Sequence, residues 1–399
     1  MKVLAIYGAT FDTFGGTRFV AENTKALRYV GHQVDLVVGN DMKPDKIINS
    51  SATGIILSGK FTDRDYIDKI IKTSEDYDLT IIYCLPFIEK NDTSDRRDLI
   101  LDNVIRLLDG IKTKLIVSNV DQNNKVFKTK IGLEQACRRA DLVLHYAKEG
   151  TLAKKLKEWK IDTPMDHQYT SRDFSYLRDK YWRPVSDMNL RSATWIGRST
   201  SWKKPELFAD FAYDKLRHNG FVSTIEGIER SIVYFRLLKY QRPDDFLDYS
   251  RYVSGDHTDL KTDRTYIFNK YVYEEEMERL SHTGFGADLY TLKYPEYYGT
   301  SLEQAHIDVV NVGSILMCSK HYGEHSLTMN GNSYIEECPE IIYLDRDNFD
   351  ECLDRMIELS SDPVLFDRTR NRIYDFIRSQ SDISVVGPKL DEIIHRVVD

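Results

Sequence analysis

The stretch VLAIYGATFDTFGGTRFVAENTKALRYVG, residues 3–31, predicts the fold of the amino-terminal half of the chain. It starts with the apolar run 3–7, passes through Gly15 and Gly16, and continues as an amphipathic segment, 18–29, that ends at a glycine. This order predicts a buried strand, a glycine loop and a helix with a glycine stop. A strand that leads into a helix in this way is the first unit of an α/β sheet.

Further apolar runs follow at intervals that leave room for helices between most of them. Such alternation predicts an α/β fold with a doubly wound parallel sheet. In the amino-terminal half these runs are 34–38, 54–57, 79–83, 115–117 and 142–144. A second series predicts a second, smaller Rossmann-like lobe and comprises 195–198, a helical stretch 205–217, then 265–268, 313–317 and 341–344.

The length of the chain, 399 residues, also favours two domains. We predict an amino-terminal Rossmann-like lobe over 1–180, a carboxy-terminal Rossmann-like lobe over 190–362, and helices over 363–399 that pack on the lobes. The polar, charged segment 166–189 is the predicted connection between the lobes.

Composition and charge narrow the class of protein. Hydrophobic residues make up 41% of the chain and charged residues 30%, as in a soluble globular protein. No stretch predicts a signal peptide or a membrane helix, so we expect a cytoplasmic protein. The five cysteines lack CxxC spacing and predict reduced thiols rather than disulfides or a zinc site. The net charge of −8 argues mildly against a protein that coats nucleic acid, although a local basic face is compatible with it.

Gly15 and Gly16 form the first candidate ligand contact. Backbone N–H groups at a helix start can face an anion, and glycine lets a ligand approach the backbone closely. A plain strand-to-helix turn explains these glycines equally well. The spacing matches neither the dinucleotide motif GxGxxG nor the P-loop, so oxidoreductase and kinase interpretations lose most of their support.

Arg198 and Lys203 follow the predicted strand 195–198, with hydroxyl side chains between them. Two cations on one strand-end loop could hold a diphosphate and stabilise it as it leaves. Residue type alone favours the alternative that both are solvated surface charges.

The segment 301–308, SLEQAHID, predicts a helix start with Ser301 as N-cap, Gln304 completing a capping box, and Glu303 in the first turn. An acid in a first turn is favoured by the helix dipole whatever the function. The functional alternative is that Glu303 accepts hydrogen bonds from sugar hydroxyls and Asp308 from a ribose diol. Five residues turn an ideal helix by about 500°, so the two acids would serve different parts of a ligand.

Taken together, short motifs along nearly the whole chain resemble the DNA α-glucosyltransferases of T-even bacteriophages. These enzymes transfer glucose from UDP-glucose to 5-hydroxymethylcytosine in phage DNA. Several motifs in one order are more specific than any one of them. The motifs are Gly31-His32, Gly132-Leu133-Glu134, Arg138-Arg139-Ala140-Asp141, Tyr181-Trp182, Trp195-Ile196-Gly197-Arg198, Trp202-Lys203, Glu226-Gly227-Ile228-Glu229-Arg230-Ser231, Glu278-Arg279-Leu280-Ser281, Gly284-Phe285-Gly286, and Ser301-Leu302-Glu303 with His306.

The resemblance implies a GT-B fold, two Rossmann-like lobes with a cleft between them, and transfer that retains the anomeric configuration. It implies that the donor is a UDP-sugar and that the chemistry needs no metal or further cofactor. Asp121 matches the acid that the family places beside the acceptor, where it could orient or deprotonate the hydroxyl. The implied donor contacts are Arg198 and Lys203 on the diphosphate, Glu303 on the sugar, Asp308 on the ribose, and Gly15 and Gly16 approaching from the other lobe.

Two positions depart from the family pattern. Val120 stands where the family has a histidine beside the acceptor acid, and Asp308 is shorter than the family's glutamate. These departures leave the sugar open between glucose and a pentose such as arabinose, carried by UDP-glucose or UDP-arabinose.

The implied partner is double-stranded DNA containing 5-hydroxymethylcytosine, met by a monomer in the cytoplasm of an infected bacterium. The base would have to flip out of the duplex to reach an enzyme cleft, and a basic rim would hold the phosphates. Two alternatives remain: a GT-B glycosyltransferase with a non-DNA acceptor, and an inactive protein that binds nucleotide sugars or DNA. The predicted rim comprises Lys125, Lys128, Lys130, Arg138 and Arg139, with Lys154, Lys155 and Lys157 nearby.

Overall fold

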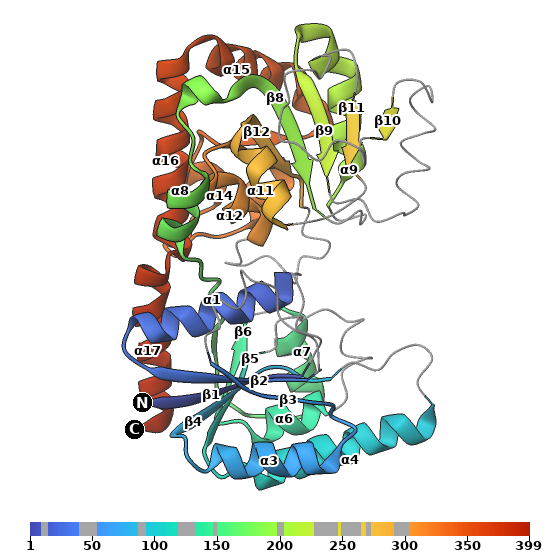
Figure 1. Ribbon diagram of the computed structural model, residues 1–399, viewed down its shortest axis with the longest axis vertical. Helices are drawn as coiled ribbons and strands as arrows, with labels where there is room; N and C mark the ends of the chain where they lie inside the picture. Colours follow the sequence, from blue (N-terminus) through green and yellow to red (C-terminus); the bar gives the residue numbers. More distant parts are fainter. Residues whose placement is uncertain are drawn as a thin grey trace. The chain divides into compact units, whose positions relative to one another are not determined.

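A computed structural model gives the structure of the chain in two compact units. The first unit takes its described residues from 1–173 and 381–399, and the second from 174–294 and 302–380. The chain passes from the first unit to the second after Asp173 and returns after Gln380 (Figure 1). The domain limits inferred from the sequence stay predictions. The described residues are 1–8, 15–39, 54–86, 93–118, 132–146, 150–197, 203–226, 246–248, 265–268, 273–290 and 303–399.

The first unit contains a seven-stranded sheet with the order β3-β2-β1-β4-β5-β6-β7. Each neighbouring pair of strands is parallel, which confirms the predicted doubly wound parallel sheet. Every predicted strand is present, and one further strand, β7, was not predicted. The strands are β1 (Lys2–Tyr7), β2 (Gln33–Val38), β3 (Ile55–Ser58), β4 (Leu79–Cys84), β5 (Lys114–Ser118), β6 (Leu142–His145) and β7 (Met165–His167).

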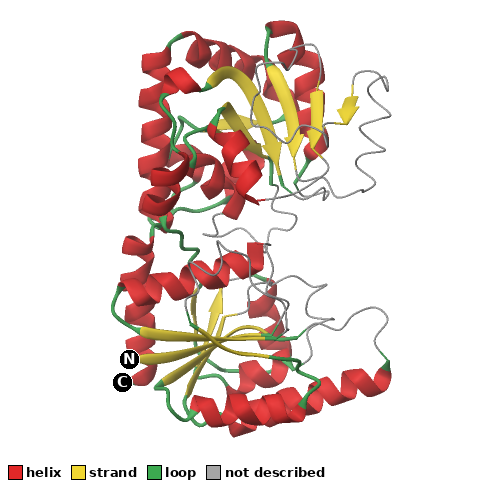
Figure 2. Cartoon of the chain, viewed as in Figure 1, coloured by secondary structure: helices red, strands yellow, loops and turns green. Residues whose placement is uncertain are grey.

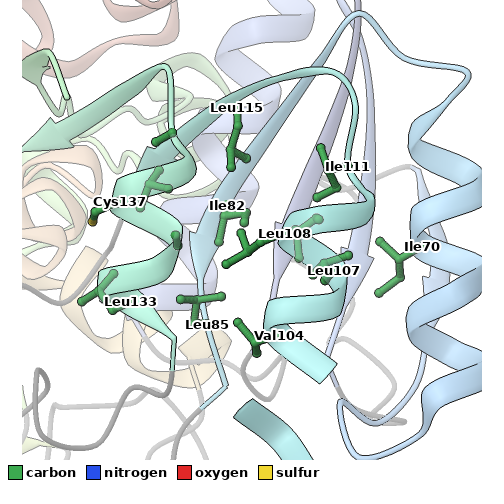
Figure 3. Packing of buried hydrophobic residues seen from close by; sticks show 14 of the residues in the cluster. Ile70, Ile82, Leu85, Val104, Leu107, Leu108, Ile111, Leu115, Leu133 and Cys137 are labelled. Atoms are coloured by element: carbon green, nitrogen blue, oxygen red, sulfur yellow. The ribbon is translucent and has the colours of Figure 1, made fainter. Parts of the chain in front are cut away.

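Helices cover both faces of this sheet, which explains why its strands are apolar without alternation. Side chains that point to one face, such as Ile82 and Leu115, pack into a core formed with four helices (Figure 3). Those on the other face, such as Ile81 and Ile116, lie against two helices. The first four are α3 (Arg64–Ser74), α4 (Ser94–Gly110), α6 (Leu133–Arg139) and α7 (Thr151–Glu158), and the other two are α1 (Gly15–Tyr29) and α17 (Ile383–Val398).

Helix α1 begins at Gly15, so the two glycines open the helix, as the sequence indicates, and form its first turn. The helix therefore begins three residues before the predicted amphipathic segment 18–29. Near its other end, the helix packs closely against α17: a Cβ on Gly387 would lie only 2.8 Å from the carbonyl oxygen of Ala26. The first helix of the chain thus packs against its last helix, and the close approach requires a glycine at position 387.

The second unit contains another seven-stranded parallel sheet, with the order β10-β11-β9-β8-β12-β13-β14. The second sheet has as many strands as the first, so the prediction of a smaller second lobe was wrong. Three of its strands, β9, β10 and β12, were not predicted. The strands are β8 (Asn189–Ile196), β9 (Val222–Glu226), β10 (Phe246–Asp248), β11 (Thr265–Phe268), β12 (Thr283–Asp288), β13 (Ile315–Ser319) and β14 (Ile342–Leu344).

The predicted helical stretch 205–217 is present, but only its first part is α-helical. A π-helical turn and a 3₁₀ turn follow before Gly220, whose positive φ of 77° ends the stretch. The predicted connection 166–189 contains part of β7 and the whole of α8. Helices are drawn in red in Figure 2, and those described in this unit are α8 (Phe174–Tyr181), α9 (Pro205–Phe211), α11 (Tyr273–Ser281), α12 (Gln304–Asn311), α13 (Lys320–His325), α14 (Tyr334–Glu337), α15 (Phe349–Ser361) and α16 (Pro363–Ser381).

The carboxy-terminal residues 363–399 are helical, as the sequence predicts. All five cysteines are buried free thiols, which confirms the expectation of reduced cysteines. In the described part of the chain, no helix is both long and apolar enough to cross a membrane.

Candidate functional site

The order of the strands marks one place in the second sheet where a ligand site is expected. From β8, the chain winds to β9 on one side and later to β12 on the other. Ligands of open parallel sheets bind at such a switch point, beyond the carboxyl ends of the strands. The side chains that follow β8 and β12 are therefore the first candidates.

The position of Lys203 after β8 is restricted by a hydrogen bond to its backbone and by the backbone angles of neighbouring residues. Trp195 is fully buried, and its indole Nε1 donates to the carbonyl oxygen of Lys203 at 3.1 Å. Gly197 and Lys204 have positive φ angles of 138° and 42°. A left-handed lysine is uncommon and strained, and Pro205 next to it occupies a position at the start of α9 that favours proline. These constraints fix where the Lys203 side chain leaves the backbone.

The Lys203 ammonium lies between two carboxylates. Its Nζ donates to Asp288 Oδ2 at 2.8 Å and to Glu303 Oε2 at 2.9 Å. It also lies 4.9 Å from the centre of the Tyr290 ring, within range of a cation–π interaction. The structure thus brings together Lys203 and Glu303, two of the predicted donor contacts, which are 100 residues apart in sequence.

Asp288, the last residue of β12, is completely buried. His306 Nε2 lies 3.0 Å from the Asp288 carbonyl oxygen and 3.6 Å from its Oδ2. Among the described residues, no group hydrogen-bonds to Asp288 Oδ1 or to His306 Nδ1. The three side chains of Lys203, Asp288 and His306 therefore form one buried polar cluster at the switch point.

Burial and charge shift the pKa values of this cluster in different directions. Burial opposes the charge on Lys203, but the carboxylates of Asp288 and Glu303 outweigh it and raise the pKa of the ammonium. Burial raises the pKa of the Asp288 carboxyl against the opposing charge of Lys203. Burial also lowers the pKa of His306, which favours a neutral imidazole. Lys203 is thus a cation throughout the neutral range.

Glu303 is the N-cap of α12, and Gln304 is its first residue. The predicted capping box was therefore wrong, and Glu303 does not lie in the first turn; Ser301 lies outside the described residues. The Glu303 side chain makes no capping hydrogen bond, because its carboxylate is directed to Lys203 instead. About a quarter of this side chain remains exposed, 28%, which leaves it accessible to a ligand.

Asp308 lies one turn further along α12 and is buried, with 2% exposed. Its Oδ1 accepts a hydrogen bond from the Tyr273 hydroxyl at 2.9 Å. The two predicted acids of this segment thus have different surroundings, Glu303 accessible beside a cation and Asp308 enclosed beside a phenol. The assignment of Asp308 to a ribose stays a prediction.

A buried ion pair lies at the end of the neighbouring strand β9. Glu226 Oε2 accepts from Arg279 Nε at 3.0 Å and Nη2 at 2.8 Å. Both residues belong to motifs that support the family resemblance. Burial raises the pKa of Glu226, and the Arg279 guanidinium opposes that shift. The pair joins β9 to α11 beside the switch point.

Some of the predicted site residues lie outside the described residues. These are Arg198, Asp121 with Val120, and the lysines of the predicted DNA rim, Lys125, Lys128 and Lys130. Their predicted roles stay predictions. Gly15 and Gly16 are placed in the first turn of α1 in the first unit.

The two described arginines of the predicted rim are engaged within the first unit. Arg138 donates to Glu134 Oε1 at 2.7 Å and to the carbonyl oxygen of Trp159. Arg139 donates to the carbonyl oxygen of Ile111 at 2.9 Å. Both arginines precede β6, at the amino-terminal edge of a parallel sheet, whereas ligands bind at the opposite edge. Their contacts favour a structural role.

Sequence reasoning missed Asp288, Tyr290 and His306 as members of the site. His306 appeared only as part of a family motif, and Asp288 was not considered because β12 was not predicted. An aspartate that directly follows a short apolar and glycine-containing run was the available signal. Among the described residues, no group of three or more potential ligands could hold a metal ion.

Comparisons with known proteins agree with this geometry. The family model of DNA alpha-glucosyltransferase matches residues 14–364. The DNA alpha-glucosyltransferase of Enterobacteria phage T4 is 27% identical over 414 residues, which cover 99% of this chain and all of that protein. A solved alpha-glucosyltransferase in complex with UDP-glucose and DNA containing an abasic site superposes with a TM-score of 0.85 at 26% identity, and 99% of each chain is covered.

A more distant structure shares the fold alone. Anabaena HepE in complex with UDP-glucose has a TM-score of 0.61 at 12% identity, with 99% of this chain and all of that chain covered. The GT-B fold predicted from the sequence is confirmed by the match to alpha-glucosyltransferase together with the two parallel sheets.

Proposed function

Because the chain belongs to the DNA alpha-glucosyltransferase family, we propose that it transfers glucose from UDP-glucose to the hydroxymethyl group of 5-hydroxymethylcytosine in double-stranded DNA. The observation that carries the proposal is the placement of Lys203 and Glu303 together at the switch point of the second sheet. A cation suits a diphosphate, and a partly exposed carboxylate suits sugar hydroxyls. Both parts of a sugar nucleotide thus have a matching group.

The relatives support the choice of donor and acceptor. One solved relative holds UDP-glucose with DNA, and another holds UDP with a 13-mer DNA containing an HMU base. The second relative is 25% identical, with a TM-score of 0.85 and 99% of each chain covered. For this chain we propose the same kinds of ligand, a UDP-sugar and a hydroxymethylated pyrimidine in DNA.

In the proposed reaction, the hydroxymethyl oxygen attacks the anomeric carbon of glucose. A new carbon–oxygen bond forms as the bond to the diphosphate breaks, and the bonding electron pair leaves with UDP. Arg198 and Lys203 stabilise the negative charge that develops on the diphosphate. Asp121 orients the attacking hydroxyl or takes its proton. Glu303 holds the sugar, Asp308 the ribose, and Gly15 and Gly16 approach the donor.

The acceptor adds a requirement of its own. The hydroxymethyl group of a base inside a duplex cannot reach the anomeric carbon of an enclosed donor, so the cytosine must flip out. Lys125, Lys128 and Lys130 supply the proposed phosphate contacts, and DNA binding should weaken as salt rises. We propose that the protein acts as a monomer in the cytoplasm of an infected bacterium.

A UDP-pentose such as UDP-arabinose is the second candidate donor. The burial of Asp308 beside Tyr273 does not distinguish the two donors, because that contact concerns the proposed ribose site rather than the transferred sugar. The accessible Glu303 would hydrogen-bond to the hydroxyls of either sugar. We therefore base the proposal of glucose on the relative that binds UDP-glucose.

Release of UDP tests the proposal. The protein is incubated with UDP-glucose and either hydroxymethylated DNA or unmodified DNA of the same sequence. UDP formed only with hydroxymethylated DNA is the expected result. UDP formed equally with both would indicate hydrolysis or a different acceptor, and no UDP with either, nor with UDP-arabinose, would contradict a transferase that acts on DNA.

A further inference from the structure

Asp288 is a buried acid for which the proposed reaction has no role. It ends β12 directly beside the end of β8, and its side chain is completely enclosed. A buried carboxylate is costly unless it is paired and hydrogen-bonded. Its one described cationic partner is Lys203 at 2.8 Å, so the two side chains depend on each other.

His306 fixes the backbone of Asp288. Because a carbonyl oxygen can only accept, the hydrogen bond of 3.0 Å to the Asp288 oxygen requires the proton on His306 Nε2. The imidazole packs edge-on against the Tyr322 ring, with 4.7 Å between the ring centres. The start of α12 is thereby tied to the end of β12, and the carboxylate of Asp288 has a defined position.

This arrangement restricts Lys203 before any ligand binds. A free lysine side chain samples many rotamers and loses that freedom when it is fixed. Here the ammonium is held by Asp288 from β12 and by Glu303 from the N-cap of α12. An ammonium has three N–H donors, so one remains beyond these two carboxylates. Ordering a contact group in advance lowers the cost of binding.

We propose that Asp288 is a positioning residue of the donor site, which holds the Lys203 ammonium in place for the diphosphate and, through it, the Glu303 carboxylate for the sugar. The inference rests on the proposed function, because the diphosphate and the sugar are parts of the proposed donor. Asp288 itself does not touch the donor and acts through Lys203.

A double-mutant cycle measures whether Asp288 acts through Lys203. The affinity for UDP is measured by calorimetry for the native protein, Asp288→Asn, Lys203→Gln and the double variant. We expect Asp288→Asn to weaken UDP binding about tenfold in the native background and to have no effect in the Lys203→Gln background. Equal losses in both backgrounds, or tighter binding by Asp288→Asn, would overturn the inference.

Two further variants separate position and charge from a general loss of stability. Asp350→Asn removes an exposed aspartate that pairs with Lys215 elsewhere in the second unit, and it should leave the UDP affinity unchanged. Asp288→Glu keeps the charge but displaces the carboxylate by one methylene, so it should weaken UDP binding even if Asp288→Asn does not fold. Native affinity in a folded Asp288→Glu variant would contradict a positioning role.

The pH profile gives a readout that a purely structural role would not change. The described groups that face Lys203 are Asp288, Glu303, His306 and the Tyr290 ring. Because Asp288 raises the pKa of Lys203, its removal should lower that pKa. The affinity of Asp288→Asn for UDP should then fall at a lower alkaline pH than that of the native protein. Asp288→Glu should keep the native profile, and coincident profiles for native and Asp288→Asn would count against the inference.

Failure of this inference can be told apart from failure of the proposed function. The cycle measures UDP binding, whereas the function is tested by transfer from the native protein to DNA. If the native protein transfers glucose but Asp288→Asn and Asp288→Glu bind UDP normally, only the role of Asp288 is refuted. If the native protein binds UDP but modifies no DNA, the proposed acceptor is refuted while the cycle still tests Asp288.

Discussion

Both sheets reverse their winding direction at their first strand, at β1 between β2 and β4 and at β8 between β9 and β12, but the two switch points differ in their residues. In the first unit, Gly8 follows β1, and its backbone N–H donates to the Cys84 carbonyl oxygen at 2.8 Å. A Cβ on Gly8 would lie 2.9 Å from that oxygen, so the two segments meet backbone to backbone. In the second unit, the corresponding place holds the ion pair of Lys203 and Asp288. The same kind of switch point thus occurs in both sheets, and the residues that follow its strands decide what it can bind.

In the proposed function the donor is held mainly by residues of the second unit, and the acceptor hydroxyl is oriented by Asp121, which belongs to the sequence of the first unit. Asp121→Ala should reduce turnover by about 10²–10⁴-fold, the range typical of a lost general base. The affinity for UDP should stay native, because the proposed contacts to the diphosphate and the ribose lie in the second unit and none of them is made by Asp121. Steady-state transfer and UDP calorimetry check the two halves of this prediction. Near-normal turnover would remove Asp121 from the reaction.

Lys203→Met should reduce turnover by about 10²–10³-fold, the loss typical when one group that stabilises transition-state charge is removed. Unlike Asp121→Ala, it should also weaken UDP binding, since the ammonium would contact the diphosphate before and during the reaction. Lys320→Met is a suitable control, because Lys320 pairs with exposed Asp347. Equal UDP affinity in native protein and Lys203→Met would place the diphosphate elsewhere.

Glu303→Gln should lower the preference for UDP-glucose over UDP about tenfold, because a hydrogen bond to a charged group becomes one to a neutral amide. The measurement is the ratio of the two dissociation constants in the native protein and the variant. Glu324→Gln, a change of the same kind in α13, should leave the ratio unchanged. A native ratio in Glu303→Gln would show that this carboxylate does not contact the sugar.

The smallest of the expected effects is on DNA affinity and concerns two arginines of the first unit. Replacing both Arg138 and Arg139 with glutamine should change DNA affinity less than about twofold, because both guanidinium groups are engaged within the unit. If the two arginines contacted phosphates, replacing them would instead lower the salt dependence of DNA binding by about one charge per arginine. Salt titration of DNA binding distinguishes the two roles and tests the basic rim predicted from the sequence.

The sequence was sufficient for much of the fold because the first sheet is covered on both faces. Its strands are continuous apolar runs, which are visible without any alignment. Strand β12, TGFGAD, was missed because its two glycines resemble a turn. The structure requires them for close packing: a Cβ on Gly284 would lie 2.8 Å from the Leu190 oxygen, and one on Gly286 2.5 Å from Val309.

The site was predictable where residue type carried the signal and not where tertiary contacts decided. Lys203 and Glu303 were identified from their chemistry and from the family motifs. Asp288 lies 85 residues from Lys203 in sequence, and only strand pairing brings the two together. A second tertiary contact accompanies the wrong prediction of the helix start: Glu303 occupies the N-cap position of α12, and its side chain pairs with Lys203 instead of making a capping hydrogen bond.

Mass spectrometry of nucleosides tests the central claim most directly. DNA containing 5-hydroxymethylcytosine is treated with the protein and UDP-glucose, digested and compared with unmodified DNA treated in the same way. The account predicts a hexose added to 5-hydroxymethylcytosine alone, and no addition with Lys203→Met. No sugar on the modified base, or a pentose added from UDP-arabinose while UDP-glucose gives none, would contradict it.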